Sequence, residues 1–429
     1  MNGSASTAGG ATAGAAAPAA AETVFTFDAT PVVFGDGCFG EVDFQVARLG
    51  VTRALLVCDP HVAASGLAAQ LAGALAARGI SSEVYDRIAG EPGEESAQDA
   101  IAAATTGGFD GFVGVGGGSA LDTAKLCALF ATHGGELLDY VNKPIGEGRQ
   151  VPGPVLPLVA VPTTAGTGSE VTSVNVLDFP RLGVKTGISH RYLRPRVAVV
   201  DPLLSLSCPR GVTAAAGLDA LAHALEAFTA RPYGARPHAA PEERPPYQGA
   251  GPLTDALAAR AIELVGRSLR RAVADGGDLA ARRDMALAAT SAGIAFGNAG
   301  VHVPHALAYP IASLKHAWSP PGYPGGTAFV PHGLAVAVTS PAAYRALAAA
   351  APERCREAAR LLDGSDDLAA AFARLMADVG APATLRELGY DESDIPAVVE
   401  GALKQQRLLT MAPWDVSAAD LEAIVGASL

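Results

Sequence analysis

The stretch that decides the fold is DGFVGVGGG, residues 110–118, followed directly by SALDTAKLCALFATHGG, residues 119–135. The first segment is a short apolar run ending in glycines and predicts a strand; the second predicts a helix that ends at a Gly-Gly pair. Ser119 is a residue type that favours a helix N-cap. Glycines let backbone N–H groups approach a ligand, and a helix N-terminus favours negative charge. The turn therefore suits a pyrophosphate, or is a tight strand–helix turn without a ligand.

The same alternation of strand and helix surrounds this unit. Helices are predicted at 63–79 and 95–108. Strands are predicted at 53–59, 81–86, 157–162, 171–178, 183–189 and 196–201. This spacing indicates βαβ units and a parallel, Rossmann-like sheet.

The second half of the chain has a different residue composition and periodicity. From Thr213 onward, long Ala- and Leu-rich periodic stretches replace the β-branched runs, which predicts an all-helical domain. We therefore divide the chain into a disordered tail (1–22), an α/β dinucleotide-binding domain (23–208) and a helical metal-binding domain (209–429). Residues 231–252 and 317–331 are too rich in Pro and Gly for helix and are expected to be functional or disordered loops.

Bulk properties exclude several classes of protein. The net charge of −12 and the lack of a basic block argue against a nucleic-acid partner. Five scattered cysteines without a CxxC pair argue against a disulfide framework. The Ala/Gly/Ser/Thr-rich first 22 residues contain no Lys or Arg, and no window is apolar enough to span a membrane. We expect a cytoplasmic protein that acts on a small molecule and has no membrane partner.

One helical motif carries unexpected polar residues. In GLDALAHALEAF, residues 217–228, Asp219 and His223 are four positions apart and so share one helix face. An exposed or core-satisfied pair would explain them. Alternatively, His305 in VPHALAYP and His332 in VPHGLAV complete a set of one carboxylate and three imidazoles, which suits Fe(II) or Zn(II).

Two further features concern a nucleotide. Asp59 ends the first predicted strand, where it would accept hydrogen bonds from a ribose and favour NAD over NADP, or would cap the turn beside Pro60. The loop VPTTAGTGSEVT, residues 161–172, places several hydroxyls directly after another strand. Two polar loops at strand ends make a ligand crevice more probable than either loop alone.

Five ordered motifs resemble the iron-containing (group III) alcohol dehydrogenase family: GGGSALDTAK, VPTTAGTGSEVT, GLDALAHALEAF, HALAYP and VPHGLAV. Within the family the chain is most similar to the hydroxyacid–oxoacid transhydrogenase branch, on the residues at 137–148, 244–256, 296–311 and 330–342. The resemblance covers nearly all of the chain beyond the tail. It implies a dehydroquinate synthase-like architecture with the active site between an α/β and an all-α domain.

The resemblance also implies the roles of particular residues. The metal, Fe2+ or Zn2+, would be held by Asp219, His223, His305 and His332, which are also the catalytic residues. NAD would contact Asp59, Gly117, Gly118, Ser119, Asp122, Thr163, Thr164, Thr167 and Lys185. Many family members have a second histidine, proposed to assist proton movement, where this chain has Tyr309. We therefore assign no histidine proton relay there; the nearby His302 is either a substitute for it or only a histidine with its hydrogen bonds satisfied.

The implied reaction is hydride transfer between a hydroxyacid and a 2-oxoacid, for example from 4-hydroxybutyrate to 2-oxoglutarate, giving succinate semialdehyde and 2-hydroxyglutarate. The alternative is an ordinary NAD-dependent alcohol dehydrogenase of the same family that exchanges its cofactor freely. A lyase of the dehydroquinate synthase fold and a non-catalytic binding protein are less well supported. Candidate cations for a substrate carboxylate are Lys315, Arg231 and Arg244. A homo-oligomer, dimer or larger, is expected by analogy.

Overall fold

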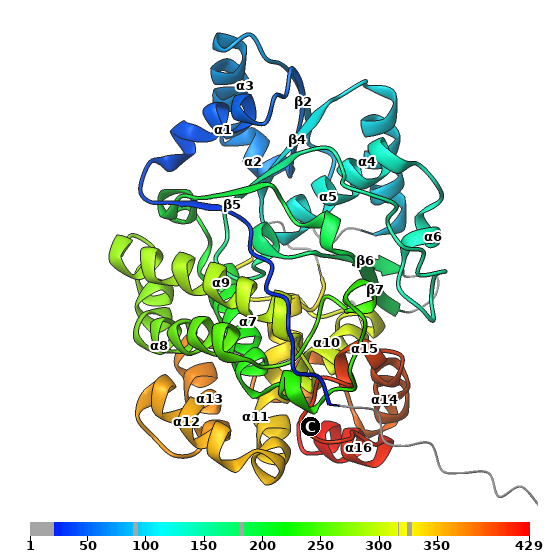
Figure 1. The fold of residues 1–429 in the computed structure, drawn as a ribbon. Coiled ribbons are helices and arrows are strands. Elements are labelled where there is room, and N and C mark those ends of the chain that lie inside the picture. Colours follow the sequence, from blue (N-terminus) through cyan, green and yellow to red (C-terminus); the bar gives the residue numbers. More distant parts are fainter. Residues whose placement is uncertain (1–20, 89–92, 180–183, 316, 324–327) are drawn as a thin grey trace, which may run out of the picture.

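A computed structural model describes residues 21–88, 93–179, 184–315, 317–323 and 328–429 of the chain. Figure 1 shows two halves, with an α/β half above a helical half. The predicted fold class, an α/β half followed by an all-helical half, is confirmed. No helix among the described residues is long and apolar enough to cross a membrane.

A six-stranded, fully parallel sheet forms the centre of the α/β half. Its strands, in the order β1-β8-β5-β4-β2-β3, are β1 (Val32–Phe34), β8 (Val197–Val200), β5 (Leu158–Pro162), β4 (Gly111–Gly116), β2 (Arg53–Cys58) and β3 (Ser81–Tyr85). β1 was not predicted; it is only three residues long, too short to show a pattern. The chain order reverses between β2 and β4, and ligands bind at the carboxyl ends of the strands beside such a switch point.

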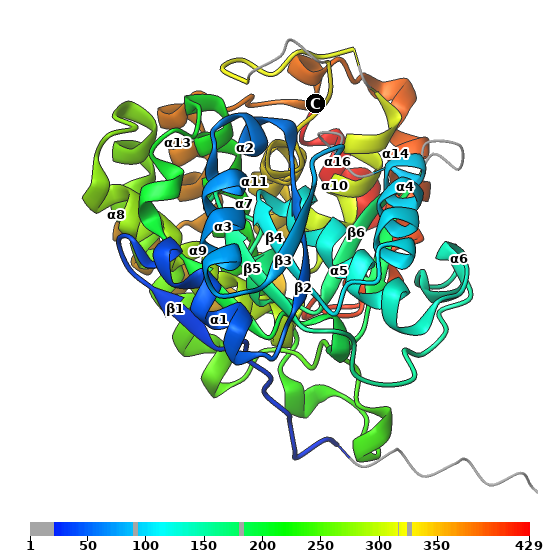
Figure 2. The same cartoon turned by 90° about the horizontal axis from the view of Figure 1, so that it is seen from above.

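Helices cover both faces of this sheet, which explains why its strands are apolar throughout. In β2, Ala54 and Leu56 pack toward α1 (Val42–Arg48) and α3 (Leu67–Ala77), whereas Leu55 and Val57 face the opposite layer. That layer contains α4 (Glu94–Thr106) and α5 (Gly118–His133). Figure 2 shows the strands between these two layers. The short helices α2 (Pro60–Ala64) and α6 (Leu137–Tyr140) complete the half.

Two predicted strands do not belong to the parallel sheet. β6 (Val174–Phe179) and β7 (Val184–Ser189) pair antiparallel with each other as a separate ribbon. The physical reason is the short connection: four residues can close a hairpin, but a parallel crossover needs a dozen or more. The ribbon lies between the two halves in Figure 1, and β7 packs against α10 (Val303–Leu314).

The helical half is built around α7 (Arg210–Thr229), which is buried along most of its length. Further helices of this half are α8 (Pro252–Ala274), α9 (Leu279–Ala299), α11 (His332–Ala350), α12 (Pro352–Asp363), α13 (Leu368–Val379), α14 (Ile395–Leu403), α15 (Gln406–Leu409) and α16 (Ala418–Gly426). Residues 231–252 contain only two short 3-10 turns, at Tyr233–Ala235 and Pro241–Glu243. The predicted domain boundary at 208/209 falls between β8 and α7 and stays a prediction.

The segment before β1 corrects part of the domain prediction. Residues 1–20 of the predicted tail lie outside the described residues, but Glu22 is buried and its backbone N–H donates to Arg236 O at 2.9 Å. Further along, Thr26 N–H donates to Gln248 and Asp28 N–H donates to Asn298. The chain thus runs along the helical half before it enters the sheet (Figure 1). Its buried carboxylate and backbone bonds, invisible in the sequence, hold it there.

Candidate metal and nucleotide site

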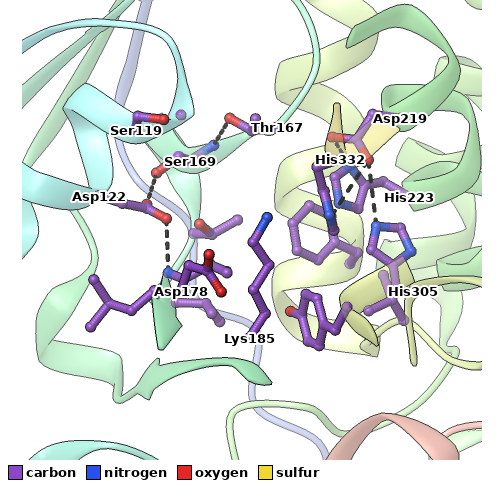
Figure 3. Close-up of a pocket in the computed structure, with 18 of the residues that line it drawn as sticks. Ser119, Asp122, Thr167, Ser169, Asp178, Lys185, Asp219, His223, His305 and His332 are labelled. Atoms are coloured by element: carbon purple, nitrogen blue, oxygen red, sulfur yellow. Dashed lines mark hydrogen bonds and ion pairs between the residues drawn. The ribbon is translucent and has the colours of Figure 1, made fainter. Parts of the chain in front are cut away.

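A cleft between the two halves holds most of the predicted site residues. It contains about 830 Å³ of empty space, including its open mouth. The residues that line it include Gly118, Ser119, Asp122, Thr167 and Lys185 from the α/β half and Asp219, His223, His305 and His332 from the helical half. In Figure 3, Ser119, Thr167 and Ser169 lie across the cleft from Asp219 and the three histidines, and Lys185 lies between the two sides.

Three of the four predicted metal ligands meet at one point. One ligand atom each from Asp219, His305 and His332 lies within 4.8 Å of the others. Asp219 Oδ1 is 3.6 Å from His305 Nε2 and 4.0 Å from His332 Nε2. These side chains come from α7, α10 and the first residue of α11, so only the tertiary fold brings them together.

The fourth predicted ligand, His223, lies beside this point without joining the three. Its Nδ1 is 3.9 Å from Asp219 Oδ2, as the four-residue spacing on α7 requires. Its ring stacks between Phe296, with ring centroids 4.0 Å apart, and His305, at 4.4 Å. His223 therefore lines the cleft, while its role as a ligand stays a prediction.

A close helix contact places His332 next to Asp219. The adjacent Gly333 packs so tightly on α7 that an added Cβ would lie 2.1 Å from Ala215 O and 2.9 Å from Asp219 Cβ. Only glycine permits this approach without moving one of the helices. The His-Gly pair in the sequence therefore positions an imidazole at the start of α11 over the carboxylate on α7.

A buried carboxylate behind the site orients His305. Glu226 Oε1 lies 2.5 Å from His305 Nδ1, and its Oε2 accepts the backbone N–H of His302. Because the carboxylate accepts a hydrogen bond, it favours the proton on Nδ1, and Nε2, which faces Asp219, is the nitrogen that a metal ion would take. Carboxylate–histidine pairs of this kind hold metal-binding imidazoles in many proteins.

The electrostatics of the cluster follow from burial and charge pairing. Burial alone would raise the pKa of Asp219, but His223 and His305 outweigh it and hold the pKa below its usual value. Burial lowers the pKa of His223 and His332 to about 4 each, which keeps both imidazoles neutral at pH 7. For His305, the negative charges of Glu226 and Asp219, together with the hydrogen bond to Glu226, overcome burial and raise the pKa to about 9.

The donor set fits a divalent transition metal. Asp219 Oδ1, His223 Nδ1 and His305 Nε2 are all buried, and none of them has a hydrogen-bond partner in the part of the chain that the structure describes. Unpartnered buried polar atoms are rare because each costs about 1–3 kcal/mol. Three such atoms in one cluster are explained together if a cation takes their lone pairs, and imidazole with carboxylate suits Fe(II) or Zn(II).

The opposite wall is the start of α5. Gly117 caps this helix in an extended conformation without a side-chain hydrogen bond, so the prediction that Ser119 is the N-cap is wrong. The helix begins at Gly118, two residues earlier than it would if Ser119 were its N-cap. At Gly118 an added Cβ would lie 2.7 Å from Thr167 Cγ2, so the 161–172 loop and the helix start are in direct contact. Ser119 and Thr167 both line the cleft.

Asp122 and Lys125 tie α5 to the cleft wall. The Asp122 carboxylate accepts hydrogen bonds from Ser169 Oγ, Lys125 Nζ and Val176 N. The Lys125 side chain is fully buried and also donates to Val174 O. Asp122 is therefore already occupied by protein donors, which supports a structural role beside any cofactor contact.

Asp59 is engaged as a helix cap. Its Oδ1 accepts the backbone N–H groups of His61 and Val62 at 2.8 and 2.9 Å, which is the alternative that the sequence left open. Its Oδ2 lies near Gly116, where an added Cβ would be 3.3 Å away, at the carboxyl ends of β2 and β4. This is the position of a ribose-binding carboxylate at a switch point, so capping and ribose binding remain compatible.

Two predicted cofactor residues lie apart from the main cleft. Thr163 and Thr164 line a second, much smaller hollow that also contains Glu170 and Thr290. Thr164 approaches Gly117, where an added Cβ would be 3.5 Å from its Oγ1, so it stays within reach of the glycine turn. Their contact with NAD stays a prediction, as does that of every other residue assigned to the cofactor from sequence.

The three cations considered for a substrate carboxylate are all engaged elsewhere. Lys315 pairs with Asp394 at 2.5 Å, and Arg231 pairs with Asp415 at 2.7 Å. Arg244 approaches Glu22, at 3.9 Å. None of the three lines the cleft. Each of these side chains lies near a carboxylate far away in the sequence, a contact that the sequence alone does not show.

Several cleft residues were not assigned a role from sequence. Tyr247 and Phe296 line the cleft, and Tyr309 stacks on His332 with ring centroids 5.7 Å apart. His302 instead contacts Thr229 Oγ1 at 3.1 Å and does not line the cleft. The only sequence signal for Glu226 was its position seven residues, two helical turns, after Asp219.

Comparison with known proteins agrees with this site. Two family profiles match the chain: iron-containing alcohol dehydrogenase over residues 29–202, and the C-terminal domain of the Fe-containing alcohol dehydrogenase family over residues 246–429. The chain is 40% identical to the mitochondrial hydroxyacid-oxoacid transhydrogenase of Rattus norvegicus over 427 residues, covering 96% of this chain and 91% of the relative. The protein of that name from Homo sapiens is 39% identical, with 96% and 91% covered.

Solved structures show the same architecture. The crystal structure of a 1,3-propanediol oxidoreductase superposes with a TM-score of 0.82 at 33% identity, covering 95% of this chain and all of that one. A sulfoacetaldehyde reductase from Bifidobacterium kashiwanohense, solved with NAD+, gives a TM-score of 0.79 at 28% identity, with 95% and 99% covered.

Proposed function

The chain belongs to the iron-containing alcohol dehydrogenase family and is an oxidoreductase, and on that premise we propose that it is a metal-dependent, NAD-linked hydroxyacid–oxoacid transhydrogenase. The observation that supports the chemistry is the cluster of unpartnered donor atoms on Asp219, His223 and His305, facing the start of α5 across one cleft. The observation that supports the branch is about 40% identity to proteins of that name over 96% of the chain.

The proposed metal ligands are Asp219, His223, His305 and His332, and the metal is Fe2+ or Zn2+. Asp219 supplies the charge, His305 is fixed by Glu226, and His332 is placed by the contact at Gly333. His223 Nδ1 lies 3.9 Å from Asp219 Oδ2, so its imidazole is next to the other three proposed ligands. When bound, the metal would polarise the substrate oxygen as a Lewis acid, and NAD would carry the hydride.

The proposed cofactor site is the opposite wall. The N-terminus of α5, with Gly117, Gly118 and Ser119, offers backbone N–H groups and a favourable dipole to the pyrophosphate. Asp59 lies where it can accept from the ribose, while Asp122 holds the helix start in place. Proteins with a solved NAD+ complex share this architecture. The apolar rings of Phe296 and Tyr309 line the cleft and exclude water from the reacting carbon.

The proposed net reaction is 4-hydroxybutyrate + 2-oxoglutarate → succinate semialdehyde + 2-hydroxyglutarate. The hydroxyacid loses a hydride from carbon and a proton from oxygen, and the oxoacid carbonyl gains one of each. No NAD is consumed overall.

The second candidate function is an NAD-dependent alcohol dehydrogenase that releases NADH after each turnover. The solved structures of an oxidoreductase and a reductase with this architecture favour it. The two functions share every proposed ligand and differ in whether the cofactor leaves between half-reactions.

Purified protein, assayed without added NAD, separates the two functions. We expect 4-hydroxybutyrate to reduce 2-oxoglutarate at a rate that added NAD does not change, with 2-hydroxyglutarate measured by mass spectrometry. A rate that is zero without NAD and saturates with added NAD contradicts the transhydrogenase and supports the dehydrogenase. Metal analysis of the same preparation tests iron against zinc.

Cellular location and assembly are separate proposals. We keep a cytoplasmic location as a prediction, although the animal relatives are named mitochondrial; fractionation of cells expressing a tagged chain tests it. A homo-oligomer is likewise proposed and is tested by light scattering on the purified protein.

A further inference from the structure

One cation near the cleft has no anionic partner. Arg407 lies on the short helix α15, and its guanidinium forms no ion pair with a carboxylate of the described residues. Its Nη1 is buried without any hydrogen-bond partner. Arg407 is partly buried, and partial burial of a cation without a counter-charge is costly because it removes hydration.

The contacts of Arg407 lead directly into the cleft. Its Cζ lies 4.6 Å from the centroid of the Tyr247 ring, a cation–π distance. Tyr247 and Tyr309 both line the cleft. Arg407 thus lies directly behind Tyr247 and beside α10, the helix that carries Tyr309.

The helix that carries Arg407 is anchored to the cleft wall. The neighbouring residue, Gln405, donates from Nε2 to the backbone carbonyl of Lys185 at 3.0 Å. Lys185 is on β7 and itself lines the cleft. α15 also packs against α10, which carries His305 and Tyr309. These contacts fix the guanidinium relative to both walls.

The distance from the metal cluster suits a short carboxylic acid. Tyr309 is four residues after His305 on α10, a rise of about 6 Å. In a four- or five-carbon hydroxyacid, the terminal carboxylate lies about 4–5 Å from the reacting carbon, from ordinary C–C bond lengths. A substrate whose oxygen faces Asp219 and His305 would thus place its carboxylate near the tyrosines and Arg407.

From these observations we infer that Tyr247 and Tyr309, backed by the guanidinium of Arg407, form the subsite for the distal carboxylate of a hydroxyacid or oxoacid substrate. The inference rests on the proposed function and adds its substrate-selecting residues. The tyrosine hydroxyls donate hydrogen bonds to the substrate carboxylate, and the guanidinium of Arg407 supplies the positive charge that balances it. Charge-assisted hydrogen bonds of this kind are stronger than neutral ones. Arg407 is a specificity-determining residue and takes no part in hydride transfer.

The test compares Arg407→Met, which keeps the stem against Tyr247 but removes the charge, with Arg407→Lys, which keeps the charge. Arg260→Met is the matched control, because Arg260 is exposed on α8 and pairs only with Glu263. Binding of glutarate, a non-reacting dicarboxylate, to the metal- and NAD-loaded protein is measured by calorimetry. Separately, kcat/KM is compared for 4-hydroxybutyrate and for 1-butanol, which has the same chain length without a carboxylate.

We expect Arg407→Met to weaken glutarate binding about 10- to 100-fold, the range for loss of a charged hydrogen-bonding partner. The kcat/KM for 4-hydroxybutyrate should fall equally, while that for 1-butanol changes by less than about twofold. Arg407→Lys should recover part of the loss, and Arg260→Met should behave as wild type. Thermal unfolding of each variant checks that it is folded.

Two results would overturn the subsite. One is unchanged glutarate binding in folded Arg407→Met; the other is an equal loss for 4-hydroxybutyrate and 1-butanol, which marks a structural role. These outcomes are distinct from failure of the proposed function. Wild-type protein that needs added NAD contradicts the transhydrogenase, yet a selective loss of glutarate binding in Arg407→Met still supports the carboxylate subsite.

Discussion

Replacing Glu226 with Gln tests whether the buried carboxylate tunes the metal centre. The side chain is fully buried, with Oε1 2.5 Å from His305 Nδ1 and Oε2 accepting the His302 N–H. The amide of Gln has nearly the same shape, and its oxygen can still accept the Nδ1–H bond, so His305 keeps its orientation. Its NH2 group then faces the His302 N–H, and that hydrogen bond is lost. At His305 itself, what is lost is the negative charge that makes Nε2 a stronger donor to a metal.

The magnitude follows from that difference. Loss of a carboxylate behind a metal-binding histidine costs about 10- to 100-fold in metal affinity. Because the Gln amide keeps the hydrogen bond to His305, we expect Glu226→Gln to weaken metal binding by the smaller of these amounts, about tenfold or about 1.4 kcal/mol. Glu226→Ala also removes the support of the ring, and we expect it to approach 100-fold, about 2.7 kcal/mol.

The assay is competition for Zn2+ between the metal-free protein and a fluorescent chelator. The control is Glu263→Gln, an exposed carboxylate on α8 that pairs with Arg260 far from the cluster, and it should bind as wild type. Circular dichroism confirms that each variant is folded. If folded Glu226→Gln binds Zn2+ within about twofold of wild type, the reasoning about His305 and its buried partner is refuted.

Four further outcomes test other parts of the structure. Stripping the metal with a chelator should lower the unfolding temperature, and Zn2+ at 100 times its Kd should restore about 2.7 kcal/mol; a protein whose unfolding temperature ignores metal contradicts the cluster. Gly333→Ala forces a Cβ to within 2.1 Å of Ala215 O, so it should destabilise the fold by about 1–3 kcal/mol and weaken Zn2+ binding, both measured as above. Asp59→Asn keeps a good helix cap but removes the charge, so calorimetry should show tighter NADPH binding at unchanged stability, and unchanged selectivity would leave Asp59 with capping alone. The backbone N–H groups of Val24 and Ala239 lower the pKa of Glu22 from the ordinary 4.5 to about 2. The ionised carboxylate therefore stabilises the N-terminal segment fully above pH 4.5, and this stabilisation is lost as the pH falls toward 2. Hydrogen exchange in 231–252 should rise over that window in the wild type and should not change with pH there in Glu22→Gln.

Local sequence determined the main elements of both halves. The apolar run before Gly116 and the helical pattern after it predict β4 and α5, because a strand buried on both faces must be apolar throughout. The periodic Ala and Leu residues after Thr213 predict the helices, because apolar residues at helical spacing mark the faces that are buried. Asp219 and His223 could be paired from sequence, since their four-residue spacing on a helix fixes the distance between them.

Tertiary structure decided what no local pattern contains. His305 and His332 reach Asp219 only because α10 and α11 pack on α7, and Gly333 sets how closely. The β6–β7 ribbon leaves the parallel sheet because its short connection cannot cross over. Lys315 and Arg231 pair with carboxylates far along the chain and do not line the cleft, whereas Arg407 has no carboxylate partner among the described residues. Periodicity records which face of an element is buried, but charge pairing and helix contacts depend on distances between elements that only the folded chain defines.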